Sequence, residues 1–375
     1  MKILIISSAP IILIKGKRYA YGPYVEELVL WAKQVDDVQF ACPIWNSPNG
    51  LLIRELPFEN SFIELTELTK KTKYFFHSLS SIINNVVLLY NAMRASDHIH
   101  LRCPGNMGLL GAIIQILFPH KPKTAKYAGN WDPKSKQPFS YRMQKWILSN
   151  TWLTKNMQVL VYGEWPNQSK NVKAFFTATY NATEFENVRI DKSIEDQIKC
   201  IFVGTLTANK RPLLAAKVVQ KLYEQGYKVQ LTYYGDGPER HAIENFVLDY
   251  NLQQVISLKG NVAKDVLIKA YQKAHTLLFF SKSEGWPKAI AEAMAWGCVP
   301  LATSVSCVPM MLDQGNRGVL VNTEINSIVS EIEKLINNPT TYKQKSKQAI
   351  TWSRQFTLEK FEEAIGLLLK ATDKN

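Results

Sequence analysis

The 375-residue sequence contains no apolar run long enough to cross a lipid bilayer. Its longest runs, residues 105–118 and 3–14, are shorter than the roughly 18 to 20 residues that a spanning helix needs. The five cysteines form no CxxC pair and are odd in number, which argues against a disulfide framework. The sequence also has no Asp-x-Asp motif, no internal repeat and no low-complexity tract. The cysteine pattern predicts reduced thiols and a cytoplasmic protein.

Acidic residues are fewer than basic ones, and the formal net charge is +13. Residues 1–190 contain 22 Lys and Arg against 13 Asp and Glu, an excess of +9, whereas residues 191–375 contain 23 against 19, an excess of +4. We therefore expect any anionic surface that this protein meets to lie against its first half. Because no RNA- or DNA-binding motif accompanies the charge, nucleic acid is not an expected partner.

Short apolar runs alternate with amphipathic segments along most of the chain, which is typical of strands and crossover helices in a parallel sheet. The chain also exceeds the size of one hydrophobic core, so two domains are expected. In the first half the predicted strands are 3–7, 38–42, 99–102, 124–128 and 159–162, and the predicted helices are 24–34, 74–95 and 108–117. In the second half the predicted strands are 201–203, 229–234, 256–258 and 277–280, and the predicted helices are 212–225, 239–248 and 264–274.

The polar segment 184–197 has no strong apolar periodicity and is the expected linker. We predict an α/β fold of two doubly wound domains, residues 1–186 and 187–352. A C-terminal helix over residues 353–375 is expected to pack back toward the N-terminal domain. A cleft between two such domains is the natural place for a ligand.

The start of one predicted helix is suited to phosphate binding. It follows the predicted strand 277–280 at the carboxyl end, where open α/β sheets bind their ligands. Pro287 suits the first position of this helix. Three backbone amides are then expected to be unpaired and available to a phosphate: those of Lys288, Ala289 and Ile290.

Two carboxylates flank this helix start. Glu292 lies four residues beyond Lys288 on the same helical face, and Glu284 lies on the preceding loop. Ionised carboxylates accept hydrogen bonds from hydroxyls, so the pair predicts a ribose at one end of a diphosphate and a sugar at the other. The alternative is that Glu284 is an ordinary loop carboxylate and that Glu292 is a partly exposed helix residue.

Residues 284–300, EGWPKAIAEAMAWGCVP, closely resemble the signature E-G-F-P-x-x-x-x-E-A-M-A-x-G-x-P of the family 4 retaining glycosyltransferases. The resemblance is strongest over residues 199–322 and implies the GT-B fold, in which two Rossmann-like domains face a central cleft. It implies sugar transfer from a UDP- or GDP-sugar to a hydroxyl, with retention and without a cofactor. Because the sequence has no Asp-x-Asp motif, we also expect the transfer to be independent of a metal ion. Glu284 then orients sugar hydroxyls and Glu292 holds the ribose. The motif is completed by Gly285, Trp286 and Pro287, with Trp286 in place of the usual Phe.

Three more loops of the second half are similar to the family pattern. "FVGTLTANKRP" resembles G-R-L-x-x-x-K, with Gly204 and Lys210 present and Thr205 in place of Arg. The resemblance implies that Lys210, with Arg211 as its helper, binds the diphosphate. "YYGDGPER" resembles the G-x-G-P turn, and "KGNV" resembles the loop that contacts the base through backbone groups. The positions carried over from these two loops are Gly235, Gly237, Asn261 and Val262.

The resemblance is weaker in the first half. Gly22 falls where the family has a glycine-rich loop near the diphosphate and the donor sugar, although the usual double glycine is absent. Many relatives have a His near the sugar at the end of a first-domain strand. This sequence reads "KYAGNWDP" there, so Asn130 or Asp132 is the expected substitute, and the six histidines are expected to be structural.

Residues 121–155 combine basic and aromatic side chains and contain one acid, Asp132. This composition predicts contact with anionic lipid at the inner face of the cell membrane or with a lipid-linked acceptor. Eight residues supply the charge: Lys121, Lys123, Lys126, Lys134, Lys136, Arg142, Lys145 and Lys155. Four apolar side chains at helical spacing are instead expected to pack on the sheet: Phe139, Met143, Trp146 and Ile147.

Other enzymes share the two-domain fold. A nucleotide-sugar epimerase needs catalytic acids and a His that we cannot place, and a phosphorylase needs a cofactor lysine in a different context. A nucleic-acid-binding protein is favoured by charge alone. The sequence therefore predicts a glycosyltransferase that acts on a saccharide or lipid-linked acceptor in bacterial polysaccharide or glycoconjugate synthesis, with the epimerase as the alternative.

Overall fold

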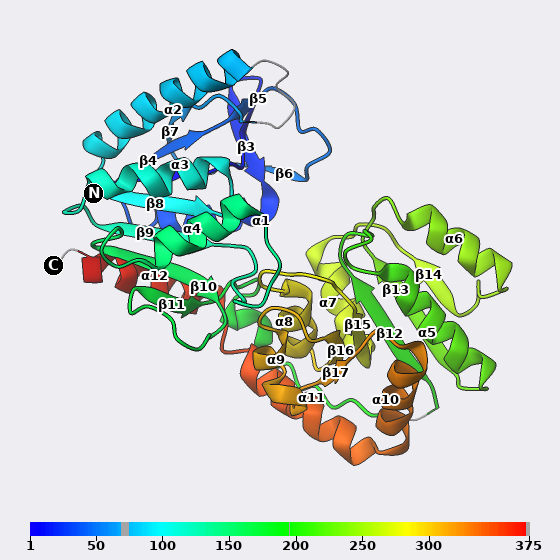
Figure 1. Cartoon of the computed structure of the whole chain (residues 1–375). Coiled ribbons are helices and arrows are strands. Elements are labelled where there is room, and N and C mark those ends of the chain that lie inside the picture. Colours follow the sequence, from blue (N-terminus) through cyan, green and yellow to red (C-terminus); the bar gives the residue numbers. More distant parts are fainter. Residues whose placement is uncertain (69–74, 195, 373–375) are drawn as a thin grey trace. The chain divides into compact units, whose positions relative to one another are not determined.

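The computed structural model describes residues 1–68, 75–194 and 196–372, which form two compact units (Figure 1). Unit 1 comprises Met1–Phe176 and Glu359–Asn375, and unit 2 comprises Thr177–Leu358. The segment 184–197, where we expect the linker, overlaps the 3₁₀ helix η2 (Ala182–Phe185) and includes residue 195, which lies outside the described residues.

The main sheet of unit 1 has seven parallel strands: β1 (Lys2–Ile6), β4 (Asp37–Cys42), β7 (Ser61–Glu64), β8 (His98–Cys103), β9 (Lys123–Tyr127), β10 (Met157–Tyr162) and β11 (Val172–Phe175). Their order is β11-β10-β9-β8-β1-β4-β7. The chain adds β4 and β7 on one side of β1 and then places β8 on the other side, so the strand order reverses between β1 and β8.

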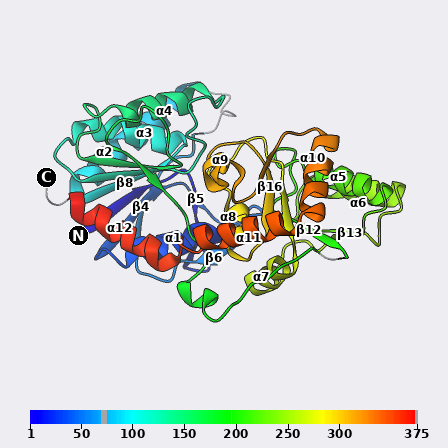
Figure 2. The ribbon, with the colours of Figure 1, turned by 90° about the horizontal axis from the view of Figure 1, so that it is seen from below.

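Helices cover both faces of this sheet, which explains why its central strands are buried on both sides. On β1, the side chains of Ile3, Leu4, Ile5 and Ile6 are at most 1% exposed. Helices α2 (Phe75–Ala95), α3 (Asn106–Ile114) and α4 (Phe139–Ser149) lie on one face, and α1 (Gly22–Ala32) and α12 (Leu358–Thr372) lie on the other (Figures 1 and 2). Among the described residues, no helix combines the length and apolarity needed to cross a membrane.

Unit 1 also contains a small sheet that the sequence analysis did not predict. Its strands are β2 (Ile11–Ile14), β3 (Lys17–Tyr21), β5 (Ile44–Trp45) and β6 (Ile53–Glu55), in the order β5-β2-β3-β6. β2 and β3 form a hairpin through Lys15 and Gly16, both with positive φ (48° and 79°), as a two-residue type I′ turn requires. Gly22 therefore begins α1 after this hairpin and does not directly follow β1.

Unit 2 has a six-stranded parallel sheet in the order β14-β13-β12-β15-β16-β17. The strands are β12 (Ile198–Val203), β13 (Val229–Tyr234), β14 (Ile256–Leu258), β15 (Thr276–Phe279), β16 (Val299–Thr303) and β17 (Val319–Val321). The helices are α5 (Pro212–Glu224), α6 (Arg240–Asp249), α7 (Lys264–Lys273), α8 (Lys288–Ala295), α9 (Val308–Met311), α10 (Ile325–Asn337) and α11 (Pro339–Ser353). The strands and helices predicted from the sequence are confirmed in both units, with small shifts at their ends, although the predicted helix start at Tyr74 lies outside the described residues.

A buried group of charges lies between α1 and the sheet of unit 1. Arg102 Nη1 is 2.6 Å from Glu27 Oε1, and Lys126 Nζ is 2.7 Å from Glu27 Oε2. The Lys126 side chain is 1% exposed, and its Nζ lies 4.9 Å from the ring centre of Phe361 on α12. Burial raises the pKa of Glu27, but the charges of Arg102 and Lys126 outweigh it and lower this pKa to about 2.

The basic segment 121–155 contributes less surface charge than its sequence predicts. Lys123 and Lys126 lie on β9, which is buried along its whole length. Lys123 Nζ donates a hydrogen bond to the carbonyl of Phe118 at 2.6 Å, and burial lowers its pKa to about 8. These two cations therefore face the protein interior, so the prediction of eight surface cations is wrong for them.

The prediction that four apolar side chains of α4 pack on the sheet is correct for Ile147 and for Met143, which packs partly buried against the core of unit 1, but wrong for Phe139 and Trp146. Ile147 is 4% exposed, whereas Phe139 and Trp146 are 71% and 63% exposed. Successive residues turn by about 100° around a helix, so Ile147 points away from the direction of Trp146. The buried face of α4 is centred on Gln144 and Leu148, and it leaves the two aromatic rings in solvent.

Candidate functional site

The strand order of unit 2 reverses between β12 and β15, which is where open α/β sheets bind ligands. Residues 204–211 connect β12 to α5, and residues 280–287 connect β15 to α8. Asn209 joins these two loops, because its carbonyl accepts from Lys282 N–H at 2.8 Å and its side chain donates to the Ser283 carbonyl at 3.0 Å. The two loops carry eight of the residues that the sequence motifs single out: Gly204, Thr205, Lys210, Arg211, Glu284, Gly285, Trp286 and Pro287.

Lys210 and Glu284 form an ion pair between the two loops. Lys210 Nζ lies 2.9 Å from Glu284 Oε1, and the side chains are 23% and 14% exposed. The stem of Lys210 passes over Gly204, where an added Cβ would lie 3.3 Å from Lys210 Cδ. The glycine thus lets the lysine cross the end of β12 and reach the carboxylate.

Arg211 is held next to this pair in a strained conformation. It precedes α5 with φ 50° and ψ 51°, in the left-handed region, which costs a non-glycine residue about 1–3 kcal/mol. Its Nη1 donates to the carbonyl of Phe280 at 3.0 Å, so the guanidinium lies at the carboxyl end of β15. Strain of this kind persists where the surrounding structure imposes it and is common at functional sites.

Gly235 and Gly237 allow the turn after β13 to pack directly on the loop after β12. A Cβ on Gly235 would lie 2.0 Å from the carbonyl oxygen of Gly204, and one on Gly237 would lie 2.6 Å from that of Leu206. Gly235 N–H also donates to the carbonyl of Gly260 at 2.8 Å, in the loop after β14. That loop contains the exposed Asn261 and the half-buried Val262. The glycines thus bring three loops together at one edge of the sheet.

The start of α8 differs from its prediction. The helix begins at Lys288, with Pro287 as its N-cap residue. The amide of Lys288 donates to the Trp286 carbonyl and that of Ile290 donates to the Pro287 carbonyl, both at 2.9 Å. The expectation of three unpaired amides is therefore wrong for these two, because the chain closes a tight turn before the helix. The amide of Ala289 lies between them.

The other motif residues on this loop pack inward. Trp286 is 8% exposed, and its ring lies 5.7 Å from that of Phe356 and 6.4 Å from that of Trp352. The carbonyl of Gly285 accepts a hydrogen bond from Ser306 Oγ at 3.0 Å. Both contacts fix the course of the loop that carries Glu284. In the β12 loop, Thr205 stands exposed where the family has Arg.

Glu292 is held by two hydroxyl groups that the sequence analysis did not identify. Thr179 Oγ1 donates to its Oε1 at 2.9 Å, and Tyr271 OH donates to its Oε2 at 3.2 Å. Burial, followed by the charge of Glu292, raises the pKa of Tyr271 well above its ordinary value, so this phenol is a hydrogen-bond donor at neutral pH. Each carboxylate oxygen keeps a lone pair for a further donor. Tyr271 lies at a buried position of α7, but no sequence signal marks Thr179.

In unit 1, Asn130 and Asp132 organise the loop after β9. Asn130 Oδ1 accepts from the amide of Asp132 at 2.9 Å, and Asp132 Oδ1 accepts from the amide of Lys134 at 2.8 Å. The Asn130 carbonyl also accepts from the side chain of Gln137. Gly22, on another part of unit 1, donates its amide to the Leu52 carbonyl at 2.8 Å. The structure does not bring Gly22 together with this loop in any described hydrogen bond.

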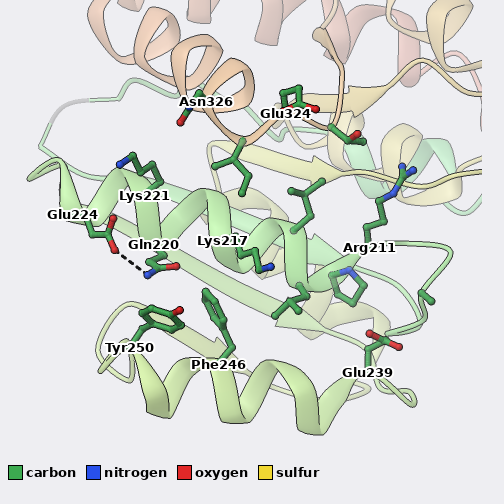
Figure 3. A pocket seen from close by; sticks show the side chains of 16 residues that line it. Arg211, Lys217, Gln220, Lys221, Glu224, Glu239, Phe246, Tyr250, Glu324 and Asn326 are labelled. Atoms are coloured by element: carbon green, nitrogen blue, oxygen red, sulfur yellow. Dashed lines mark hydrogen bonds between the residues drawn. The ribbon is translucent and has the colours of Figure 1, made fainter.

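A hollow of about 910 Å³ lies along α5, between α6 and the start of α10 (Figure 3). Arg211 and Glu239 lie at one end of it, and Lys221 and Glu224 lie at the other. Its charges alternate in sign, and Gln220 already donates to Glu224 at 2.9 Å. The side chains of this hollow do not converge on one ligand chemistry, whereas those at the ends of β12 and β15 do.

Comparison with known proteins identifies the family. The sequence model of the family glycosyl transferases group 1 matches residues 184–352. An uncharacterized glycosyltransferase of Methanocaldococcus jannaschii is 32% identical over 355 residues, which cover 91% of this chain and 93% of that protein. The chain belongs to the group 1 glycosyltransferases. Protein CapJ of Staphylococcus aureus is 22% identical to this glycosyltransferase over 366 residues, covering 92% of the chain and 88% of CapJ.

The fold is the GT-B fold of two Rossmann-like domains. The crystal structure of Anabaena HepE in complex with UDP is similar to this glycosyltransferase with a TM-score of 0.70, covering 99% of this chain and 100% of HepE at 13% sequence identity. The predicted fold class is thereby confirmed. Among the residues that the structure describes, no group of three or more His, Cys, Asp or Glu side chains is arranged to hold a metal ion.

Proposed function

We propose that this glycosyltransferase transfers a sugar from a UDP- or GDP-sugar to a hydroxyl of a saccharide or lipid-linked acceptor, with retention at the anomeric carbon. We place the reaction in the cytoplasm, in the synthesis of a bacterial polysaccharide or glycoconjugate. The observation that carries the proposal is the Lys210–Glu284 pair at the point where the strand order of unit 2 reverses. The binding of UDP by HepE, which has a similar fold, supports a nucleotide donor.

In this proposal the cations stabilise the leaving diphosphate. Negative charge grows on the leaving oxygen as the bond to the sugar breaks, and fixed cations lower the barrier because they need no reorganisation. Lys210 and Arg211 supply this charge, the amide of Ala289 adds a donor, and no metal ion is required. The diphosphate draws Lys210 from Glu284, so the carboxylate becomes available to a sugar hydroxyl when the donor is bound.

The second carboxylate, Glu292, binds the ribose. Its two oxygens already accept from Thr179 and Tyr271, which fixes the plane of the carboxylate. The ribose hydroxyls then donate to the lone pairs that remain. The loops of Gly235, Gly237, Asn261 and Val262 contact the rest of the nucleotide through backbone groups.

The proposed reaction is tested by product analysis. A panel of UDP-, GDP- and ADP-sugars is first screened for stabilisation of the protein against heat, since a ligand that binds only the folded state raises the melting temperature. The anomeric configuration of the product is then determined by NMR, with and without EDTA. We expect the configuration of the donor to be retained and the rate to be unchanged by EDTA. Inversion of configuration excludes the retaining mechanism, and isomerisation of the donor without acceptor supports the epimerase.

Tyr271→Phe tests how Glu292 is positioned. The variant removes the hydroxyl that donates to Oε2, and one hydrogen bond to a charged group accounts for about 1.5–3 kcal/mol. We expect the KM for the donor to rise about tenfold or more, with little change in kcat, because the ribose does not react.

Tyr342→Phe is the matched control for this prediction. Tyr342 is also fully buried, and its hydroxyl donates to the His275 carbonyl at 3.2 Å, away from Glu292. It should lower stability without changing the KM. An unchanged KM in Tyr271→Phe, or an equal rise in both variants, contradicts the role of Tyr271.

A further inference from the structure

Helix α2 presents an apolar stripe to solvent. Leu79, Ile83, Val87 and Tyr90 are between 39% and 57% exposed. Their spacing of three and four residues places them on one side of the helix. A surface helix ordinarily has charged side chains on this side, but α2 contains no acidic residue, and Arg94 is its one Lys or Arg.

The neighbouring helices add further exposed apolar side chains to this side of unit 1. α2, α3 and α4 lie side by side over one face of the unit 1 sheet (Figures 1 and 2). The ring of Tyr90 lies 5.2 Å from that of Phe118, which joins α2 to the segment after α3. We call this surface the α2–α4 face. Its other exposed apolar residues are Ile113, Leu117, Phe139, Trp146 and Trp152, of which Trp152 is the most exposed at 74%.

Cations are interspersed with these apolar side chains. The exposed ones are Arg94, Lys134, Lys136, Arg142 and Lys155. Over residues 79–156 the sequence contains only two acids, Asp97 and Asp132. Asp97 accepts a hydrogen bond from the backbone amide of Lys2, and Asp132 accepts one from the backbone amide of Lys134. Both acids are therefore already hydrogen-bonded to the backbone. The α2–α4 face is therefore apolar and positively charged.

We propose that the α2–α4 face docks this protein on an anionic lipid bilayer. Tryptophan side chains favour the boundary between headgroups and acyl chains, and lysine and arginine are attracted to anionic headgroups. A second copy of the chain fits less well, because a two-fold interface would bring the same net positive surface against itself. The proposal does not depend on the sugar-transfer reaction.

The test is flotation of the full chain with vesicles. Phosphatidylcholine vesicles that contain phosphatidylglycerol are compared with vesicles of phosphatidylcholine alone, at low and high salt and without any sugar nucleotide. We expect binding to the anionic vesicles that weakens as salt screens the charges. The double variant W146S/W152S should bind at least about tenfold more weakly, since it removes the two largest exposed rings.

The matched control is the double variant Y223S/Y250S in unit 2, which replaces two aromatic residues that are 50% and 53% exposed. It should bind as the unaltered chain does, and all proteins should melt at similar temperatures because the altered side chains lie on the surface. Three results overturn the proposal: no binding to anionic vesicles, equal binding by W146S/W152S, or a dimer in solution that this variant dissociates.

Discussion

Replacing Lys210 with methionine is expected to lower kcat by about 10²–10³, which corresponds to roughly 2.7–4 kcal/mol in the barrier. Methionine keeps an apolar stem that can pack over Gly204, so the variant removes the charge and leaves the packing. The loss should fall on kcat, because charge accumulates on the diphosphate as the sugar departs. Initial rates at saturating donor, together with the melting temperature, measure the effect.

Lys217→Ala is the control for this prediction. Lys217 is an exposed lysine of α5, seven residues after Lys210, and its replacement changes the net charge by the same amount. Its rate should stay within about twofold of the unaltered enzyme. If the kcat of Lys210→Met is more than a third of the kcat of the unaltered enzyme, Lys210 does not stabilise the leaving group.

Replacing Glu27 with leucine is expected to destabilise unit 1 by about 3–5 kcal/mol. The variant leaves Arg102 and Lys126 as two buried cations without their shared carboxylate. Unfolding in urea measures the loss. The further changes Arg102→Leu and Lys126→Met should recover part of it, because apolar side chains carry no desolvation penalty.

Glu26→Leu is the control, because Glu26 is the adjacent residue and its ion pair with Arg54, at 3.4 Å, is exposed. It should change stability by no more than about 1 kcal/mol.

The pH dependence of stability provides a second test of the role of Glu27. The pKa of Glu27 is about 2 in the folded protein against an ordinary 4.5, so its stabilisation is present above about pH 4.5 and is lost as the pH falls toward 2. The stability difference between the unaltered protein and Glu27→Leu should narrow over this range, and a constant difference contradicts the ion-pair explanation.

The sequence predicted the main strands because parallel strands that are buried on both faces are continuous apolar runs. It did not predict the β2–β3 hairpin, because residues 3–14 form a nearly unbroken apolar run that hides the end of β1. Gly16 was the one local signal, because Lys15 is not among the residues that favour the first position of a two-residue turn. The sequence also did not predict that the rings of Phe139 and Trp146 are exposed, because apolar spacing does not reveal which side of a helix faces the sheet.

For the site, the sequence identified Lys210 and Glu284 separately but could not pair them. They are 74 positions apart, and only the placement of β12 beside β15 makes their loops neighbours. The unpaired amides expected at α8 were wrong in part, because a local turn closes around Pro287. Thr179 could not be predicted, since a threonine in an irregular segment carries no periodicity or motif that refers to Glu292.

The chain returns to unit 1 after completing unit 2, and this order affects synthesis. During translation the seven strands of unit 1 leave the ribosome first, but α12 follows only after all of unit 2. Until then the side of the sheet that carries Lys126 lacks Phe361, its partner from α12. Domains fold as units while the chain is made. Unit 1 therefore lacks α12 until the end of the chain has been synthesised. On a ribosome that is stalled before residue 359, proteases should readily cut the nascent chain in its first half.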